Sequence, residues 1–321
     1  GWCAASPAID LALKSRFAAA LARLNPGAGR IGLAVSGGPD SLALLLLSEA
    51  AIPGGFAVAT VNHGLRAAAA EECALVSQVC EARAIACTLL PVQVAPGNVQ
   101  AQARDARYAA LAGWARGAGL AAIATAHHAD DQAETLLLRL NRGSGVAGLA
   151  GVRETGVIAG MPIIRPLLAF RRAELAAVVA GLAVVDDPSN RDLRFDRARL
   201  RAALAGADWL DPAMLAQSAR HLAEAEEALE WAAAREWVAQ VAEGDGGLAY
   251  TPAAPRAVRL RVVERIIAAL GQSPRGADVA RRMRETKVSG VMIGRAAMQN
   301  PWVFREAKHF LETGMESPEI L

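Results

Sequence analysis

The sequence predicts an α/β fold in which a parallel sheet has helices on both faces, followed by a small helical second domain. Short runs rich in Val, Ile and Leu alternate with longer segments whose apolar residues have helical spacing. Such alternation is typical of βαβ units, whose strands are parallel and covered by helices. A glycine turn after the first strand supports the same fold, since ligands of these sheets bind at the carboxyl ends of the strands.

The first domain is expected over residues 1–205. Its predicted strands are Ile31–Val35, Phe56–Val61, Ile85–Val92 and Leu120–Thr125. Its predicted helices are 41–50, 67–84, 99–117, 130–141 and 171–182. The glycine-rich stretch 143–151 is predicted to be a loop outside the core.

The second domain is expected over residues 206–280, with helices at 212–242 and 258–270. The amino-acid composition of the chain changes after this second domain. Residues 283–321 hold two of the three lysines and four of the six methionines, but only three alanines. We therefore treat 281–321 as an atypical tail.

Composition narrows the class of protein. With 321 residues, about two domains are expected, and no uncharged apolar run reaches the roughly 18 residues of a membrane helix. We expect a soluble cytoplasmic protein that makes no membrane contact. A net charge of +2 does not by itself indicate nucleic-acid binding.

Four cysteines form no C-x-x-C pair and no zinc spacing: Cys3, Cys73, Cys80 and Cys87. Cys73 and Cys80 are seven residues apart, so on a helix they share a face and are predicted to be buried thiols. We expect neither a disulfide framework nor an iron–sulfur cluster.

The glycine turn 36–41 reads Ser-Gly-Gly-Pro-Asp-Ser. A strand that runs through such a turn into a helix leaves backbone N–H groups free to bind an anion. Its hydroxyls can donate to phosphate oxygens, and its carboxylate tolerates phosphates when Mg²⁺ lies between them. The lysine of a Walker A loop is missing. The turn predicts a nucleotide-phosphate site, and a plain strand-to-helix turn with an Asp or Ser cap is the alternative.

Acidic residues follow the fourth strand in the segment 127–134, His-His-Ala-Asp-Asp-Gln-Ala-Glu. On a helix beginning near Asp130, His127, Asp131 and Glu134 lie at i, i+4 and i+7, roughly on one face. Two carboxylates and an imidazole there can hold a cationic substrate, a metal or a proton in transit. The alternative is an acidic cluster that stabilises the helix N-terminus.

Arginines form two groups. Arg104 and Arg107 lie one turn apart on a predicted helix, where they can clamp phosphate or form a solvated face. Between residues 165 and 201 there are eight arginines against five acids. This second stretch is the best candidate for a phosphate-contacting surface.

Together these motifs resemble the tRNA(Ile)-lysidine synthetase family of the PP-loop ATP pyrophosphatase superfamily, over roughly residues 28–275. The matching segments are 36–41, 61–66, 97–108, 127–148, 165–168 and 187–201. The Ser-Gly-Gly-x-Asp-Ser turn alone is typical of the whole superfamily, whereas the ordered set is far more specific. One departure is Asn62, where the family commonly has an acid or His.

The resemblance implies an enzyme that joins the ε-amine of lysine to C2 of the wobble cytidine in an isoleucine tRNA with a CAU anticodon. ATP would first adenylate the C2 carbonyl with loss of pyrophosphate, and the lysine amine would then displace AMP. Free lysine, ATP and Mg²⁺ are the implied small molecules. A homodimer is a candidate assembly.

The resemblance also assigns roles by position. ATP with Mg²⁺ would be held by Ser36, Gly37, Gly38, Asp40 and Ser41, with Asp40 on the metal. Lysine would be recognised by Arg107, Asp131 and Glu134, and His127 would lie beside the reacting centre. Asp40, His127, Asp131 and Glu134 are the expected catalytic residues. The tRNA backbone would be gripped by Arg191, Arg194, Arg197, Arg199 and Arg201.

The segment 289–305 resembles the last strand and helix of the tRNA-dihydrouridine synthase family, a flavin TIM barrel. The other strands of that barrel are absent from the sequence, and an isolated strand and helix cannot rebuild its pocket. We therefore expect no flavin binding.

Two alternatives to lysidine synthesis remain open at this point. Another PP-loop tRNA-modifying enzyme, such as a thiolase, would need catalytic cysteines near the site. A tRNA-binding protein with an inactive nucleotide site is the alternative from a different class.

Overall fold

The computed structural model describes residues 9–62, 68–92, 99–185, 192, 194–244 and 247–269. The chain divides into two compact units, Gly1–Ala223 and Glu224–Leu321. This division falls inside a helix, whereas the predicted domain boundary lies near residue 205. The predicted boundary near residue 280 and the atypical tail lie outside the described residues.

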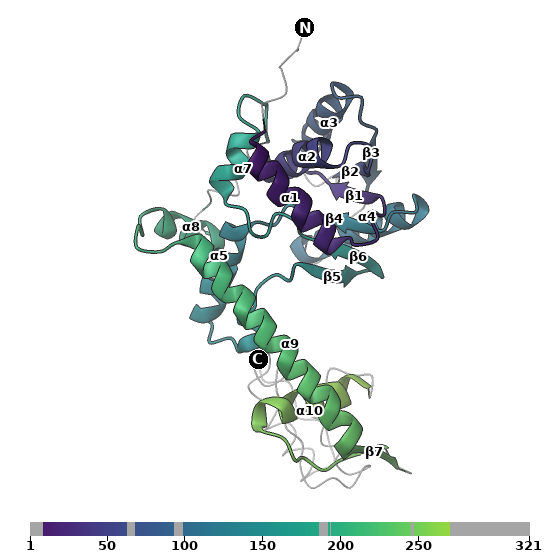
Figure 1. Ribbon diagram of the computed structural model, residues 1–321, viewed down its shortest axis with the longest axis vertical. Coiled ribbons are helices and arrows are strands. Elements are labelled where there is room, and N and C mark those ends of the chain that lie inside the picture. Colours follow the sequence, from purple (N-terminus) through teal and green to yellow (C-terminus); the bar gives the residue numbers. More distant parts are fainter. Residues whose placement is uncertain are drawn as a thin grey trace, which may run out of the picture. The chain divides into compact units, whose positions relative to one another are not determined.

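The first unit is built on a six-stranded sheet of order β3-β2-β1-β4-β6-β5 (Figure 1). Five strands run parallel and β5 is antiparallel to β6 at the edge. The strands are β1 (Ile31–Ala34), β2 (Phe56–Asn62), β3 (Cys87–Pro91), β4 (Ala122–Ala124), β5 (Thr155–Ile158) and β6 (Met161–Ile164). The predicted α/β class and parallel sheet are confirmed. The chain crosses from one side of β1 to the other between β3 and β4, so a crevice opens beyond the carboxyl ends of β1 and β4.

Helices cover both faces of this sheet, as predicted. Those of the first unit are α1 (Leu11–Leu24), α2 (Pro39–Ala51), α3 (Ala68–Glu81), α4 (Val99–Gly117), α5 (Ala129–Asn141), α6 (Val146–Leu149), α7 (Arg172–Val178) and α8 (Asp196–Ala205). One buried cluster joins α1, α2, α3 and α7 to the sheet, and a separate cluster joins α4 to it. The leucine run 42–47 of α2 is buried on all sides, which is typical of a core helix.

Four features of this unit differ from the sequence-based expectations. Helix α1, the β5–β6 hairpin and helix α8 were not predicted. The stretch 143–151 contains the short helix α6, and Ala150 is only 1% exposed, so the expectation of a loop outside the core was wrong there. The hairpin was hidden from pattern analysis because β5 is an exposed edge strand without alternating burial.

The second unit begins within α9 (Pro212–Gln240) and continues with the hairpin β7 (Val241–Gly244) and β8 (Gly247–Tyr250) and with α10 (Arg256–Ala269). Ala233, Val258 and Val262 form its buried centre. Arg261 pairs there with Glu226 and, at 3.2 Å, with Glu230. Both helices were predicted, and the hairpin between them was not.

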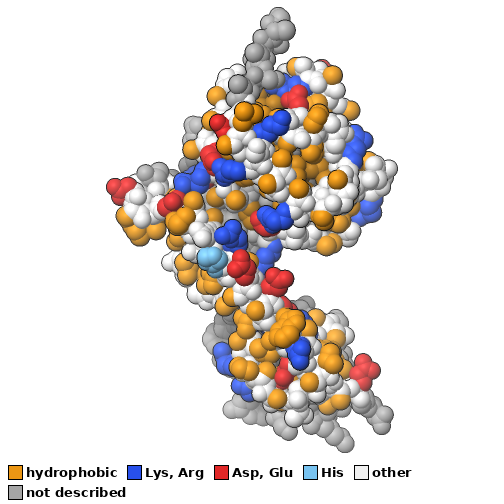
Figure 2. Space-filling model, viewed as in Figure 1, with side chains coloured by type: hydrophobic (Ala, Val, Ile, Leu, Met, Phe, Trp, Pro, Cys, Tyr) orange, Lys and Arg blue, Asp and Glu red, His pale blue; other side chains and the backbone are white. Residues whose placement is uncertain are grey.

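None of the helices in the described ranges is long and apolar enough to cross a membrane. On the face of the molecule shown in Figure 2, blue Lys and Arg side chains are scattered, with red acidic side chains among them. On this face, therefore, the basic side chains do not form one continuous positive patch.

Candidate active site

A cavity of about 290 Å³ opens at the carboxyl ends of β1, β2 and β4. Its walls come from the glycine turn, from the ends of the three strands and from helices α3, α4 and α5. The polar and ionisable groups in its lining are Ser36, Asp40, Ser41, Thr60, Glu72, Cys73, Arg107, Tyr108, Thr125, His127 and Asp131. Residues predicted from separate motifs thus meet in one place, the crevice where a doubly wound sheet binds its ligand.

Two hydroxyls hold the glycine turn in shape. Ser41 Oγ donates to Gly38 O at 2.9 Å and accepts from the backbone N–H of Ser36 at 3.1 Å. Ser36 Oγ donates to Ser41 Oγ at 3.3 Å. These contacts tie the end of β1 to the first turn of α2, so the loop is fixed before any ligand arrives.

The two glycines of the turn, Gly37 and Gly38, are required for different structural reasons. Gly37 has a φ of +83°, a left-handed conformation that glycine adopts without strain. A Cβ at this position would lie 2.8 Å from Val185 Cγ2, so the absence of a side chain also lets Val185 pack close to the turn. Gly38 has an ordinary φ of −69°, and the nearest atom to a Cβ there would be Ser36 Oγ at 3.8 Å. Gly38 lines the cavity and Gly37 does not. The missing side chain of Gly38 therefore leaves space for a ligand.

Helix α2 begins at this space without a side-chain cap. Gly38 is its N-cap residue, makes no capping hydrogen bond through a side chain, and is followed by Pro39 in the first turn. The first N–H groups of a helix carry a partial positive charge and need acceptors. A phosphate bound over Gly38 would supply them.

His127 faces the cavity as a neutral imidazole. Burial lowers its pKa to about 4, and the positive charge of Arg165 contributes in the same direction, against the opposing effect of Asp131. Its Nδ1 lies 3.0 Å from Thr125 Oγ1. At neutral pH this ring therefore adds no positive charge to the cavity.

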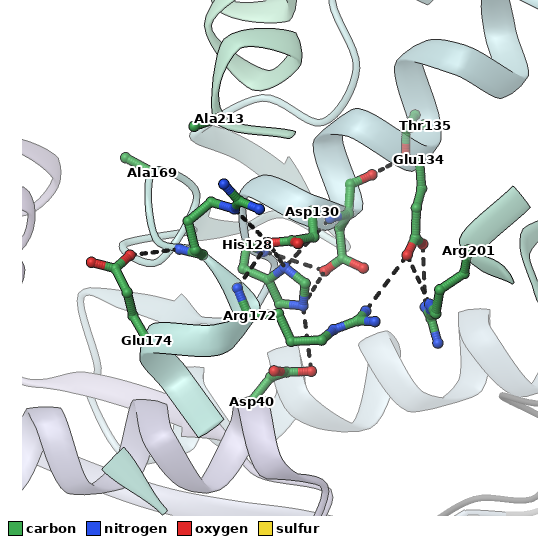
Figure 3. A network of polar contacts seen from close by, with 12 residues as sticks. Asp40, His128, Asp130, Glu134, Thr135, Ala169, Arg172, Glu174, Arg201 and Ala213 are labelled. Carbon is green, nitrogen blue, oxygen red and sulfur yellow. Dashed lines mark hydrogen bonds and ion pairs between the residues drawn. The ribbon is translucent and has the colours of Figure 1, made fainter. Parts of the chain in front are cut away.

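His128 is a functional candidate that the sequence analysis did not single out. The side chain is fully buried, and its Nε2 lies 3.5 Å from Asp40 Oδ2 (Figure 3). The same Nε2 lies 3.5 Å from Asp131 Oδ2. His128 also closes a capping box at the start of α5, because Nδ1 accepts from the Asp131 N–H at 3.4 Å while the His128 N–H donates to Asp131 Oδ2 at 3.2 Å. The His128 imidazole thus connects α2, through Asp40, to α5, through Asp131.

Asp40 and His128 shift each other's pKa in opposite directions. Burial lowers the pKa of His128, but its hydrogen bond with Asp40 and the charges of Asp40 and Asp131 outweigh that effect and raise the pKa above its ordinary value. Burial raises the pKa of Asp40, and the contact with His128, together with the charges of Arg172 and Arg201, lowers it overall. Asp40 is therefore an ionised carboxylate at neutral pH.

Asp40 also has a free oxygen. Its Oδ1 is buried and makes no hydrogen bond, although it lies beside a cavity whose other walls are polar. A buried, ionised oxygen without a donor suits a hard cation such as Mg²⁺. No group of three or more His, Cys, Asp or Glu side chains in the described ranges can hold a metal by itself, so a cation here would need further ligands from a bound phosphate.

The two predicted lysine-binding acids are separated. Asp131 lines the cavity, but Glu134 does not. The Glu134 side chain is only 2% exposed and is surrounded by Arg172, Arg197 and Arg201. The one-face argument from helical spacing therefore places Asp131 correctly at the cavity, whereas Glu134 turns toward neighbouring helices.

The arginine run 191–201 is split in the same way. Arg197 and Arg201 contact Glu134, whereas Arg194 pairs with Asp192 at 2.6 Å and Arg199 pairs with Asp196 at 2.5 Å. The Arg194 side chain is 87% exposed. Arg191 lies outside the described residues.

Helix α4 supplies Arg107 to the cavity wall, with its guanidinium 5.0 Å from the centroid of the Tyr108 ring. Arg104 stacks on the same ring at 5.3 Å, is exposed, and does not line the cavity. Of the two arginines that one turn of helix places together, only Arg107 is positioned to meet a ligand there.

The cysteines Cys73, Cys80 and Cys87 are free thiols, and Cys73 and Cys80 are buried, as predicted. Cys73 lies in the cavity wall and accepts a hydrogen bond from Thr60 Oγ1 at 3.6 Å. Burial raises the pKa of Cys73, so its thiol is protonated at neutral pH and is a poor nucleophile.

Residues 10–207 match the PP-loop domain family, a match that spans most of the α/β unit. The chain is therefore a PP-loop protein. It is 51% identical over 285 residues to a tRNA(Ile)-lysidine synthase of Novosphingobium aromaticivorans, covering 86% of this chain and 87% of the relative. The tRNA(Ile)-lysidine synthase of Zymomonas mobilis is 43% identical over 225 residues, which are 68% of each chain. The chain belongs to the tRNA(Ile)-lysidine synthase family.

Among solved structures, the chain is similar to the U34-tRNA thiolase NcsA from Methanococcus maripaludis, solved with its [4Fe-4S] cluster. The TM-score is 0.52 at 15% identity, over 64% of this chain and 76% of that chain, a likeness of fold. Residues 266–321 match the dihydrouridine synthase family, in agreement with the resemblance seen in the tail. Residues 270–321 lie outside the described part of the chain.

Proposed function

We propose that this chain ligates lysine to C2 of the wobble cytidine in an isoleucine tRNA with a CAU anticodon, converting ATP to AMP and pyrophosphate. Family membership supports the reaction. The observation that carries the proposal is the single cavity that unites the glycine turn with Asp40, Arg107, His127 and Asp131. A phosphate site and a carboxylate site must adjoin if one enzyme is to activate a carbonyl with ATP and then deliver a cationic amine to it.

The glycine turn would bind the triphosphate. The uncapped N-terminus of α2 offers N–H donors, Gly38 leaves room, and the hydroxyls of Ser36 and Ser41 fix the loop. Mg²⁺, bound by Asp40 Oδ1 and the phosphates, would offset negative charge as pyrophosphate leaves. Arg107, which also lines the cavity, would stabilise the charge that develops on the α-phosphate.

Asp131 would receive the lysine ammonium. It is the acid of α5 that lines the cavity, and the neutral His127 beside it adds no positive charge that would repel the ammonium. The amine must lose a proton before or during attack on C2, and the Asp131 carboxylate is suited to take it. Because Nδ1 of His127 faces Thr125 Oγ1, Nε2 is the ring nitrogen left for a hydrogen bond with the reacting groups.

The substrate tRNA would approach this edge of the sheet, where an anticodon loop can present unstacked bases. We expect the reaction in the cytoplasm, with a homodimer as a candidate assembly. Arg191, Arg194, Arg197, Arg199 and Arg201 remain the candidates within the arginine run for contacts with the tRNA backbone.

Incorporation of labelled lysine into an isoleucine tRNA transcript with a CAU anticodon tests the proposal, with Mg²⁺-ATP present and pyrophosphate followed in parallel. We expect equal amounts of incorporated lysine and released pyrophosphate. A methionine tRNA transcript with the same anticodon is the matched control and should accept little lysine. Absence of both products with the isoleucine tRNA would reject the proposed reaction.

A further inference from the structure

The hydroxyl of Thr125 holds the His127 ring at the edge of the cavity. Thr125 directly follows β4, and its N–H donates to Ile164 O of β6 at 3.1 Å, which anchors the backbone at this point. In an extended chain, side chains two residues apart point to the same side, so the Thr125 hydroxyl and the His127 ring are neighbours. Thr125 Oγ1 lies 3.0 Å from His127 Nδ1, and both residues line the cavity.

This contact determines which ring nitrogen of His127 carries the proton. A neutral imidazole has one N–H donor and one bare nitrogen that accepts. Burial lowers the pKa of His127 to about 4, so the ring is neutral at neutral pH. Either Nδ1–H donates to Thr125 Oγ1 and Nε2 is bare, or the Thr125 hydroxyl donates to a bare Nδ1 and Nε2 carries the hydrogen.

The partners of the Thr125 hydroxyl distinguish these two tautomers. The Thr125 residue is only 7% exposed, and within the described ranges His127 Nδ1 is the one protein acceptor within hydrogen-bonding distance of its hydroxyl. If Nδ1–H donated, the buried hydroxyl hydrogen would have no protein acceptor, whereas buried donors are nearly always paired. If the hydroxyl donates, both groups are satisfied and the hydrogen of the ring is on Nε2.

We propose that Thr125 is a positioning residue that fixes His127 as the Nε2–H tautomer, so that the ring donates a hydrogen bond to an oxygen of the ATP α-phosphate. The identity of this ligand rests on the proposed function. Phosphate oxygens only accept hydrogen bonds, so a bare Nε2 would repel them and an N–H binds them. The His127 ring neither gains nor loses a proton in this role, and Asp131 remains the proposed base for the lysine amine.

A neutral donor suits a cavity that must serve a phosphate and an ammonium in succession. Negative charge on the α-phosphate oxygens develops as pyrophosphate leaves, and a donor already aimed at them stabilises this charge without reorganisation. Because the His127 ring is uncharged, the same donor does not repel the lysine ammonium proposed to bind Asp131. Thr125 contributes by keeping the ring in one tautomer and one orientation, as partners of functional histidines commonly do.

The tautomer is measured by ¹⁵N NMR of protein labelled in its histidine rings, at neutral pH, because protonated and bare ring nitrogens have well separated chemical shifts. The chain has five histidines, so the signals lost in His127→Gln assign this ring. We expect a bare Nδ1 and a protonated Nε2 in the parent and in Thr125→Ser, and averaged shifts of two exchanging tautomers in Thr125→Val. A protonated Nδ1 in the parent would overturn the proposal. This measurement needs neither ATP nor tRNA, so it stands even if the proposed reaction is not found.

Single-turnover release of pyrophosphate, with saturating Mg²⁺-ATP and isoleucine tRNA transcript, tests the catalytic consequence. Thr125→Val keeps the β-branched shape and removes the hydroxyl, so pyrophosphate release should slow by about tenfold while ATP affinity stays within about threefold of the parent. Thr125→Ser is the matched control, since it retains the hydroxyl, and its rate should stay within about threefold of the parent. Equal losses of rate in the two variants would indicate a packing effect and overturn the positioning role, as would an unchanged rate in Thr125→Val. Melting temperatures confirm that each variant is folded.

Discussion

Replacing the two neighbouring glycines of the turn by alanine should separate backbone strain from ligand space. At Gly37, with φ of +83°, a Cβ would lie 2.8 Å from Val185 Cγ2 and 3.3 Å from Glu72 O. At Gly38, with φ of −69°, a Cβ would meet no protein atom closer than Ser36 Oγ at 3.8 Å. Gly37→Ala should therefore reduce stability, whereas Gly38→Ala should reduce nucleotide affinity.

The magnitudes follow from these contacts. In Gly37→Ala the left-handed conformation costs about 1–2 kcal/mol and the overpacking about 1–3 kcal/mol, while the stiffer unfolded chain returns about 0.4–1 kcal/mol. The net loss is about 1–4.5 kcal/mol, and a mid-range loss of about 3 kcal/mol lowers Tm by about 6–12 °C in a domain of this size. In Gly38→Ala the poorer N-cap costs about 0.5–1 kcal/mol, and the unfolded-state gain offsets it.

Differential scanning fluorimetry of the parent and both variants, with and without ATP, checks this pair. Gly37→Ala should have a lower melting temperature than the parent both with and without ATP. In the absence of ATP, Gly38→Ala should have the same melting temperature as the parent. Its affinity for ATP should be at least tenfold lower, a loss of about 1.4 kcal/mol in binding free energy. A Gly37→Ala protein as stable as the parent, or a Gly38→Ala protein with full ATP affinity, would refute the reasoning.

Three further predictions concern other parts of the chain. Asp131→Asn should raise the lysine KM at least tenfold and leave ATP affinity unchanged. Asp40→Asn should weaken ATP binding at least tenfold and leave the lysine KM unchanged. Isothermal titration with ATP and steady-state kinetics with lysine check both variants. Glu226→Gln should lower the free energy of unfolding by about 2 kcal/mol in urea, less than the roughly 3–5 kcal/mol of a fully buried pair, because Arg261 keeps a second carboxylate. Because the pKa of His127 is about 4 in the folded protein and near 6.5 when unfolded, the unfolded state binds more protons between these values and stability falls as pH drops from about 6.5 to 4. This loss should reach up to about 3 kcal/mol, and His127→Gln should remove it from the pH profile of urea unfolding.

Much of the α/β fold could be predicted because its signals are local. Helix α4 was predicted at its observed bounds, Val99–Gly117, and the strand runs were placed to within two residues at each end. Helix α1 was not predicted because alanine gives little contrast between its faces, although Leu13, Phe17 and Leu21 are buried at helical spacing. Helix α8 was not predicted, because three of its ten residues are arginine and its apolar stripe is weak.

The cavity residues could be predicted for a different reason. Ser36, Asp40, His127 and Asp131 all follow parallel strands, and the ends of neighbouring parallel strands meet at one edge. The surroundings of Glu134 could not be predicted in this way, because its partners come from α7 and α8. Helical spacing says which residues of α5 share a face, but not which other helices cover that face.

His127 and His128 show how much depends on the register of a single residue. At the end of an extended strand, successive side chains point in opposite directions, so two adjacent histidines cannot have the same surroundings. One enters the cavity, where burial keeps it neutral, and the other turns beneath α2 and α5, where Asp40 and Asp131 raise its pKa. A one-residue slip would move the bridging ring into the cavity and leave the carboxylates of Asp40 and Asp131 without their imidazole partner. The capping box between His128 and Asp131 prevents that slip, because the same imidazole that bridges the carboxylates also fixes the first turn of α5.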